Sequence, residues 1–348
     1  MDRTEESPVA IAEVLDHVFR GETLPREQAR EVMGRLMDGK LSQMQAAALL
    51  AALRTRGETI DEIVGFAEAM RERAVAVPVT VAGPLLDTCG TGGTGINTIN
   101  ISTTALFIVA AGGVKVDKHG NRGVTKRSGS ADVLEELGVD LARTPEQLAS
   151  SIEELGLAFI FARSHHPAMR FVAPIRTDLQ ARTIFNNLGP LTNPAGADRQ
   201  LMGVYSPELL ETLAEVLRGL GVERALVVHG EGIDDFTVTG ETQVVELMPD
   251  GELRRYLVAP EEVGLKRYPL SDLEGGDAAA NAAALRGILG GELGGAKRDI
   301  VLLNAGAALY LGGRCDGLRE GVALATELLD SGAAASKLEE YLAYSSRT

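Results

Sequence analysis

Residues Gly90–Gly95 (GTGGTG) are suited by type and spacing to hold a phosphorylated ligand. Glycines let the main chain approach a ligand closely, and successive backbone N–H groups can donate to a single anion. An apolar helical stretch follows at Ala105–Ala111, which we expect to begin with Ser102 or Thr103 as its N-cap. Because a helix N-terminus also attracts anions, this segment is predicted to be a phosphate-binding loop.

The same loop matches the GxGxxG spacing of a dinucleotide-binding fold at Gly90, Gly92 and Gly95, with Asp117 near the usual position of the ribose-binding acid. In that fold the third glycine already lies within the helix. Here residues 96–101 (INTINI) intervene, and their β-branched and asparagine side chains disfavour a helix. A nicotinamide or flavin site is therefore disfavoured, while a glycine-rich turn without a ligand is the simpler alternative.

A second loop, residues 118–130 (KHGNRGVTKRSGS), contains four of the chain's 34 lysine and arginine residues. It follows an apolar segment ending at Val116 and ends where a helical stretch begins. In a chain of net charge −15 such a loop is a focused positive site, although a solvated basic loop is the alternative. Two phosphate-binding loops after neighbouring strands indicate a ligand with two phosphate groups, or with a diphosphate and a monophosphate.

A pair of acids, Asp234 and Asp235, follows the apolar segment Ala225–Val228. Carboxylate oxygens at the end of a strand suit Mg²⁺, which keeps several waters and bridges substrate phosphates. Adjacent acids in a loop can also be solvated turn residues, so the pair alone does not establish a metal site.

Short apolar segments alternate with helical stretches from about residue 85 onward. This alternation predicts a largely parallel sheet with helices on its faces, in which ligands gather at the carboxyl ends of the strands. The expected strands are Leu85–Asp87, Val114–Val116, Phe159–Phe161, Leu201–Tyr205 and Ala225–Val228, with helices such as Ser130–Glu136 and Pro207–Leu220 between them.

The first part of the chain is predicted to be helical. Pro25 suits the first turn of a helix, and Ser42–Gln45 and Thr59–Glu62 have the spacing of capping boxes. The segment Ala46–Leu53 is apolar on every side, so it is expected to be buried all round, by its own domain or by a partner subunit. A segment at 77–84, rich in helix-breaking residues, separates this region from the alternating pattern.

Composition excludes several classes of protein. The charge of −15 argues against a general nucleic-acid binder and against docking on an anionic membrane. Cys89 and Cys315 lie too far apart to suggest a zinc ribbon or a redox pair, and we expect both to be small buried side chains. Without a secretory signal or a membrane-spanning apolar run, a cytoplasmic location is expected.

Five motifs, in this order along the chain, resemble those of the anthranilate phosphoribosyltransferase family. This resemblance implies a small N-terminal helical domain, a larger α/β domain with a mostly parallel central sheet, and an active site in the cleft between them. It places the helical domain at residues 1–78, joined by a helical excursion around 168–192, and the α/β domain at 79–348. The motifs are Asp87–Gly93 (DTCGTGG), Asn100–Thr103 (NIST), Lys118–Arg122 (KHGNR), Ser128–Asp132 (SGSAD) and Arg182–Pro194 (RTIFNNLGPLTNP).

The resemblance also implies a reaction: transfer of 5-phosphoribose from 5-phosphoribosyl diphosphate (PRPP) to the amine of anthranilate, with Mg²⁺ as cofactor, in a homodimer formed through the helical domain. Lys118 is the implied catalytic residue, and Ser102, Asp234 and Asp235 are the implied Mg²⁺ ligands. Asn121 and Arg176 would position anthranilate. The substrate-binding residues carried over are Gly90, Gly93, Thr94, Thr98, Asn100, Ile101, Ser102, Thr103, Lys118, His119, Gly120, Asn121, Arg122, Gly123, Val124, Thr125, Lys126, Ser130 and Arg176.

Other readings of the same motifs stay open. The chain could be a paralogous phosphoribosyltransferase or a pyrimidine nucleoside phosphorylase with another acceptor. It could also be a non-catalytic sensor that binds PRPP.

The sequence departs from the family pattern at the expected metal site. Thr94 occupies a position that is usually aspartate, Asp235 one that is usually glutamate, and Thr125 and Lys126 replace two small serines. Aspartate is shorter than glutamate by about 1.5 Å, one carbon–carbon bond, so a direct ligand could become water-mediated or be assisted by Glu231. We therefore predict a weaker Mg²⁺ dependence than is usual in the family.

Overall fold

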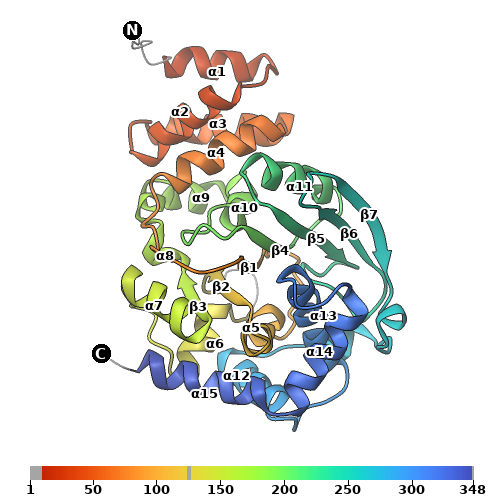
Figure 1. Cartoon of the computed structure of the whole chain (residues 1–348). Coiled ribbons are helices and arrows are strands. Elements are labelled where there is room, and N and C mark those ends of the chain that lie inside the picture. Colours follow the sequence, from red (N-terminus) through yellow and green to blue (C-terminus); the bar gives the residue numbers. More distant parts are fainter. Residues whose placement is uncertain (1–9, 124–126, 347–348) are drawn as a thin grey trace. The chain divides into compact units, whose positions relative to one another are not determined.

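The computed structural model describes residues 10–123 and 127–346, and the chain divides into two compact units. The helical unit combines residues up to Ala74 with the returning segment His166–Thr192. The α/β unit contains Val75–His165 and the residues from Asn193 onward. Figure 1 shows the elements of each unit in sequence colours.

The helical unit is built from four helices and a returning segment of short helical turns. Its apolar core is formed largely where α2 packs on α4, with Ala29, Val32, Met33 and Phe66 all buried. The elements are α1 (Ile11–Phe19), α2 (Arg26–Met37), α3 (Gln43–Arg56), α4 (Ile60–Arg71), η1 (Pro167–Phe171), α9 (Ala173–Leu179), α10 (Phe185–Leu188) and η2 (Gly189–Leu191).

Both predicted capping boxes are present at the starts of α3 and α4. Ser42 Oγ accepts from the N–H of Gln45 at 3.2 Å, and the side chain of Gln45 accepts from the N–H of Ser42 at 3.0 Å. Thr59 and Glu62 make the same reciprocal pair, at 3.3 and 2.8 Å. These bonds occupy backbone donors that a helix N-terminus otherwise leaves unpaired, which is why both helices begin where the sequence predicts.

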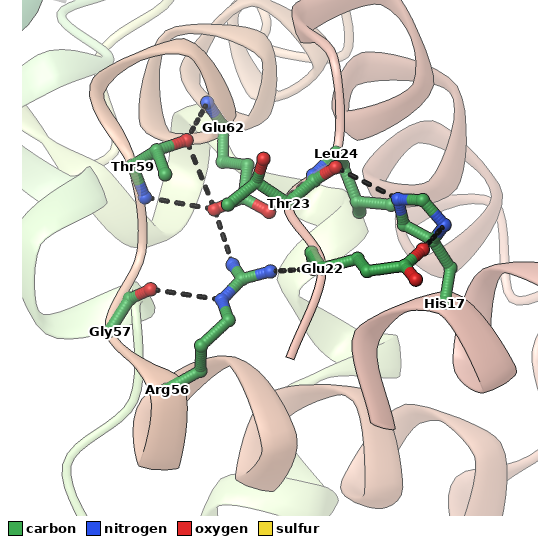
Figure 2. Close-up of polar contacts among 8 residues, drawn as sticks. All are labelled: His17, Glu22, Thr23, Leu24, Arg56, Gly57, Thr59 and Glu62. Carbon is green, nitrogen blue, oxygen red and sulfur yellow. Dashed lines mark hydrogen bonds and ion pairs between the residues drawn. The ribbon is translucent and has the colours of Figure 1, made fainter. Parts of the chain in front are cut away.

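Glu62 also joins segments that are distant in sequence (Figure 2). Its carboxylate is fully buried, and one oxygen accepts from the N–H of Leu24 at 2.8 Å. The other oxygen accepts from the N–H and hydroxyl of Thr59, at 2.8 and 3.1 Å, and pairs with the guanidinium of Arg56. A buried charge with this many partners fixes the connection between α1 and α2 to the start of α4.

Replacing Glu62 with glutamine keeps the shape of the side chain but removes the charge. We expect the free energy of unfolding to fall by about 3 kcal/mol, because the largely buried guanidinium of Arg56 would lose its carboxylate partner and keep only the carbonyl oxygens of Glu22 and Gly57. Urea unfolding monitored by circular dichroism measures this. The control is Glu68→Gln, which removes the partly exposed partner of Arg26 and should cost less than about 1 kcal/mol. Equal losses in the two variants would contradict the prediction.

The apolar helix α3 is not buried all round within this chain. Leu49, Leu50 and Leu53 are buried, whereas Met44 is 83% exposed and Ala51 is also exposed. The helical unit alone therefore leaves one apolar face of α3 uncovered.

The α/β unit contains a seven-stranded sheet in the order β3-β2-β1-β4-β5-β6-β7. Its first five strands are parallel, and the last two are antiparallel additions that were not predicted. The predicted fold class, a helical domain with a larger, mostly parallel α/β domain, is confirmed. The strands are β1 (Leu85–Gly90), β2 (Lys115–Gly120), β3 (Leu157–Phe161), β4 (Arg199–Gly203), β5 (Arg224–Gly230), β6 (Thr242–Leu247) and β7 (Leu253–Val258).

Helices cover both faces of this sheet (Figure 1). The buried helices α5 and α13 belong to the large core on one face, and α7 packs on the other. No helix within the described residues is both long and apolar enough to span a membrane. The helical elements are α5 (Ile101–Ala111), α6 (Ser130–Glu136), α7 (Pro145–Leu155), α8 (Ala162–His165), α11 (Leu209–Gly219), η3 (Pro260–Val263), η4 (Leu270–Leu273), α12 (Ala278–Leu289), α13 (Ala296–Leu311), α14 (Leu318–Asp330) and α15 (Ala333–Ser345).

The strand order changes direction at β1, because β2 follows it on one side and β4 lies on the other. In open parallel sheets, ligands bind at such a switch point, beyond the carboxyl ends of the strands. The glycine loop leaves β1 at this end, and the basic loop leaves the neighbouring strand β2.

Candidate active site

The glycine loop leads from the end of β1 into the N-terminus of α5. Gly92, Gly93 and Gly95 have φ values of 64°, 80° and 75°, in the left-handed region that favours glycine. The helix begins at Ile101 with Asn100 as its N-cap, so the predicted cap at Ser102 or Thr103 is wrong by two or three residues. The cause is in the main chain, because the carbonyl oxygen of Asn100 already accepts the first helical bond, from Thr104 at 3.0 Å.

This N-terminus has donors to offer to a ligand. Asn100 makes no side-chain cap bond, and in the part of the chain that the structure describes the N–H groups of Ser102 and Thr103 have no intrahelical acceptor. Ile101 differs, because its N–H donates to Ile99 at 3.0 Å and its side chain is buried in the core. The first turn of α5 can therefore bind an anion through Ser102 and Thr103.

The geometry argues against the dinucleotide alternative. Gly95 precedes the first residue of α5 by six positions, so the third glycine of the motif does not lie in the helix. Asp117 is fully buried and accepts from Nδ2 of Asn193 at 2.8 Å, so it is not placed to bind a ribose hydroxyl.

The acidic loop after β5 approaches the ends of β1 and β4 closely. The N–H of Gly92 donates to Oδ2 of Asp234 at 2.8 Å. A Cβ at Gly90 would lie 2.6 Å from this same oxygen, and one at Gly203 would lie 1.6 Å from the carbonyl oxygen of Asp234. Gly90 thus leaves room for the carboxylate of Asp234 beside the glycine loop, and Gly203 leaves room for its main-chain carbonyl.

Lys118 lies on β2 with 3% of its surface exposed. Its ammonium donates to the carbonyl of Thr88 on β1 at 2.8 Å and to Oγ of Ser102 on α5 at 2.9 Å. A positive charge is therefore fixed beside the first turn of α5, where the unpaired N–H groups lie. Ser130, the first residue of α6, reaches the same turn, because Oγ1 of Thr103 donates to its Oγ at 2.9 Å.

Asp132, which was not predicted to be a site residue, binds two main-chain groups of the basic loop. Oδ2 of Asp132 accepts from the N–H groups of Gly123 and Gly129, both at 2.8 Å. Arg122 pairs with Asp132 at 3.1 Å and with Glu135 at 2.7 Å, so its charge is already partly compensated. The signal in the sequence was the position of Asp132 three residues after Gly129 at the start of a helix.

All but four of the predicted site residues gather at the carboxyl edge of the sheet. Val124, Thr125 and Lys126 lie outside the described residues, and Arg176 belongs to the helical unit. Those that gather there are Gly90, Gly93, Thr94 and Thr98 of the glycine loop, Asn100, Ile101, Ser102 and Thr103 at the start of α5, Lys118, His119, Gly120, Asn121, Arg122 and Gly123 at the end of β2 and beyond, Ser130 on α6, and Asp234 and Asp235 after β5.

Arg176 lies on α9 with its guanidinium 5.9 Å from the centre of the Phe185 ring. Among the described residues of the helical unit it has no carboxylate partner, and burial lowers the pKa of its guanidinium from the usual value. A half-buried arginine of this kind suits a carboxylate supplied by a ligand.

The described residues contain no cluster of three or more histidine, cysteine, aspartate or glutamate side chains that could hold a metal by themselves. Asp234 is 6% exposed, Asp235 is half-buried, and Ser102 Oγ already accepts from Lys118. The carboxylate of Asp234 beside the glycine loop, together with that of the next residue Asp235, fits Mg²⁺ when substrate phosphates and waters complete its shell.

His229 orients the acidic loop and was not predicted to do so. Its Nδ1 lies 2.8 Å from the carbonyl oxygen of Val204, and its Nε2 accepts from the N–H of Gly232 at 3.1 Å. These contacts require a proton on Nδ1 and none on Nε2. A neutral histidine thus fixes the turn that precedes Asp234.

A buried pair of acids supports the strands beneath the site. Asp87 and Asp117 are register partners on β1 and β2, so both side chains lie on the same face, and neither is exposed. Burial raises the pKa of both carboxyls, and for Asp117 the charge of Asp87 adds to the increase. The pair is therefore harder to ionise in the folded protein than in the unfolded chain.

Asp117→Asn should reduce the pH dependence of stability. Aspartate in the unfolded chain titrates near pH 4. Above that pH the unfolded chain binds fewer protons than the native pair. The free energy of unfolding therefore falls by up to about 1.4 kcal/mol per pH unit until the pH passes the raised pKa. Asparagine imitates the protonated carboxyl and removes this cost. Melting temperatures at pH 5 and pH 8 test it: the variant should gain on the wild type at pH 8. A constant difference between the two proteins would contradict the prediction.

Family models match both units. Residues 12–74 match the helical bundle domain of a glycosyl transferase family, and residues 82–335 match the α/β domain of that family.

Curated relatives extend the similarity over nearly the whole chain. The chain is 51% identical to the anthranilate phosphoribosyltransferase of Rubrobacter xylanophilus, over 97% of this chain and 98% of the relative. It is 54% identical to that of Thermus thermophilus, over 93% and 96%.

Solved structures show the same similarity over nearly the whole chain. The crystal structure of the Thermus thermophilus enzyme superimposes with a TM-score of 0.91 at 52% identity, covering 96% of this chain and 99% of that one. Anthranilate phosphoribosyltransferase from Saccharomyces cerevisiae in complex with PRPP and Mg superimposes with a TM-score of 0.87 at 26% identity, covering 98% and 99%.

Proposed function

Because this chain belongs to the anthranilate phosphoribosyltransferase family, we propose that it transfers 5-phosphoribose from PRPP to the amine of anthranilate, giving N-(5-phosphoribosyl)anthranilate and diphosphate in tryptophan biosynthesis. The observation that carries this proposal is the convergence of β2 and α6 on the first turn of α5. Lys118 donates to Ser102, and Ser130 accepts from Thr103, both at 2.9 Å. This arrangement suits a ligand with several phosphate oxygens.

The proposed reaction is a displacement at the anomeric carbon of the ribose. The amine nitrogen of anthranilate forms a bond to that carbon, the bond from carbon to diphosphate oxygen breaks, and diphosphate leaves with the electron pair. The nitrogen then loses its extra proton to solvent. An aromatic amine is neutral at pH 7, so no base is needed before attack, and the barrier lies in charge separation at the leaving group.

The chain's own groups can stabilise that charge. The Lys118 ammonium and the unpaired N–H groups of Ser102 and Thr103 are fixed before the reaction begins, so no reorganisation is needed as negative charge develops on diphosphate. The left-handed glycines of the loop allow its main chain to follow the diphosphate closely.

For Mg²⁺ we propose Asp234 and Asp235 as ligands, with Ser102 contributing its hydroxyl. A magnesium ion bound there would neutralise charge on the diphosphate. The yeast relative in complex with PRPP and Mg supports Mg²⁺ as the cofactor. The hydrogen bond from Gly92 to Asp234 keeps that carboxylate beside the glycine loop.

For anthranilate we propose Arg176 as the partner of its carboxylate and Asn121 as a positioning group, with His119 lining the aromatic site. Arg176 is half-buried, and its lack of a carboxylate partner within the described helical unit supports this role. A guanidinium matches a carboxylate with two parallel hydrogen bonds.

We further propose a cytoplasmic homodimer formed through the helical unit. The exposed apolar face of α3, with Met44 and Ala51, supports this surface as the interface. Sedimentation velocity tests it: a monomeric mass at micromolar concentration would contradict the dimer.

The test of the function is an assay with purified protein, PRPP, Mg²⁺ and anthranilate that follows the loss of anthranilate fluorescence. Turnover is the expected result. Turnover only with another amine would indicate a paralogous transferase, and phosphorolysis of a pyrimidine nucleoside would indicate a phosphorylase. PRPP binding without turnover of any acceptor would indicate a sensor.

A further inference from the structure

Asn281, in the first turn of α12, connects the two loops of the candidate site. Its side-chain nitrogen donates to Oδ1 of Asn100 and to Oγ of Ser128, both at 2.9 Å. Asn100 is the N-cap of α5 at the end of the glycine loop, and Ser128 lies in the basic loop. One planar amide group therefore sets the separation of the two loops.

Every polar atom of this amide is occupied. Its Oδ1 accepts from the N–H of Gly276 at 2.8 Å, which fixes the orientation of the side chain, and Asn281 is only 2% exposed. The Ser128 hydroxyl also reaches Asn100 Oδ1 at 3.5 Å and closes a triangle of contacts. Because a buried, fully bonded amide has no donor left for a ligand, Asn281 acts through the residues that it holds.

The segment just before α12 holds the same glycine loop through its main chain. Gly275 donates from its N–H to the carbonyl of Asn97 at 2.9 Å, and Asn97 Nδ2 donates to the carbonyl of Gly275 at 2.7 Å. The N–H of Ile99 donates to Leu273 at 3.2 Å. A Cβ at Gly275 would lie 2.4 Å from the carbonyl oxygen of Thr98, so this close pairing requires glycine.

The basic loop is attached to the same support. The N–H of Arg127 donates to Oδ1 of Asn97 at 3.3 Å, in addition to the contact between Ser128 and Asn281. The segment from Leu273 to Asn281 thus makes hydrogen bonds to both loops. A ligand that spans two loops is bound more tightly when their separation is fixed before it arrives, because less ordering has to accompany binding.

We propose that Asn281 is a positioning residue that fixes the glycine loop and the basic loop at the separation that PRPP requires, and that it thereby determines the affinity for PRPP. The inference rests on the proposed function for the identity of the ligand. It predicts a larger effect on PRPP than on anthranilate, because the residues to which Asn281 donates, Asn100 and Ser128, are not those proposed for anthranilate, Asn121 and Arg176.

The main test is Asn281→Asp, which keeps the shape of the side chain but replaces the donor to Asn100 and Ser128 with an oxygen. We expect the KM and the calorimetric Kd for PRPP to rise at least about tenfold, as for an unmade buried hydrogen bond. The KM for anthranilate should stay within about twofold, and kcat should fall less than the PRPP affinity.

Two further variants separate positioning from a merely structural role. Ser151→Ala removes another buried hydrogen bond of the α/β unit, from Ser151 Oγ to the carbonyl of Leu157 at 2.7 Å, away from both loops. It should lower the melting temperature but leave the PRPP affinity unchanged. Ser128→Ala removes only the basic-loop contact, so it should weaken PRPP binding less than Asn281→Asp does. If Asn281→Asp does not fold, the PRPP affinity of Ser128→Ala tests the inference.

The outcomes distinguish the inference from the function on which it rests. Wild-type protein that binds no PRPP would overturn both. Wild-type binding and turnover, with a PRPP Kd within twofold of wild type in Asn281→Asp and Ser128→Ala, would overturn the inference alone. An equal rise in KM for both substrates in Asn281→Asp would also overturn it, since that result indicates general damage.

Discussion

Replacing Lys118 with alanine is expected to lower kcat/KM by about 10²- to 10³-fold, the range found when a fixed electrostatic donor is removed from an active site. The ammonium of Lys118 is held by Thr88 and Ser102 before any ligand arrives. It is 3% exposed, so water screens its charge poorly. No other described lysine bonds to the first turn of α5.

Two variants show whether the charge and its position are both needed. Lys118→Met keeps most of the side-chain volume, and should lose as much activity as Lys118→Ala with a smaller change in melting temperature. Lys115→Ala is the matched control, because Lys115 lies on the same strand but donates to the carbonyl of Glu153 at 2.7 Å near an exposed surface. The fluorescence assay measures all three. Activity of Lys118→Met within threefold of wild type would contradict the assigned role.

Local signals predicted the parts of the fold that depend on neighbouring residues. The helices at Ser42 and Thr59 begin where predicted because a capping box is made by residues three apart. The start of α5 was predicted too late because its cap, Asn100, acts through its main chain and makes no side-chain cap bond. Hydroxyl groups at positions 102 and 103 therefore gave a misleading local signal.

The strands β6 and β7 were missed although a signal was present. They form an antiparallel hairpin in which the N–H of Met248 donates to the carbonyl of Glu252 at 2.9 Å. The residues between them include Pro249, Asp250 and Gly251, a combination typical of turns. A search for turn residues between two short segments with apolar side chains could have found this pair.

The support behind the candidate site could not be predicted from local spacing. Asn281 is 181 positions from Asn100 and 153 positions from Ser128, and only the folded chain brings the three together. Motifs identified which loops hold chemical groups, because the residues of each loop are contiguous. How those loops are held depends on tertiary contacts, and one sequence contains no direct signal for them.

In the acidic loop, we expect replacement of Asp234 to lower kcat/KM more than replacement of Asp235. Asp234→Asn should lower kcat/KM by about 100-fold or more and raise the Mg²⁺ concentration for half-maximal activity. Its side chain is 6% exposed and beside the glycine loop, and asparagine can still accept from Gly92, so the loss reports the charge. Asp235→Asn should cost less, because Asp235 is half-buried and shorter than the family's usual glutamate.

Thr94 and Asp235 differ from the residues usual in the family, so restoring the usual residues tests the same metal site in the opposite direction. Thr94→Asp combined with Asp235→Glu restores the residues usual in the family, adds a negative charge beside the glycine loop and lengthens one carboxylate by about 1.5 Å. Mg²⁺ should then activate at lower concentration than in the wild type, since a hard cation gains oxygen ligands and charge. Mg²⁺ titrations of activity at fixed PRPP, compared among the wild type, both single variants and the double variant, measure this. If the wild type already requires Mg²⁺ at ordinary micromolar concentration, and Asp235→Asn loses as much activity as Asp234→Asn, then the shorter carboxylate is a full ligand and the prediction of weakened metal dependence is wrong.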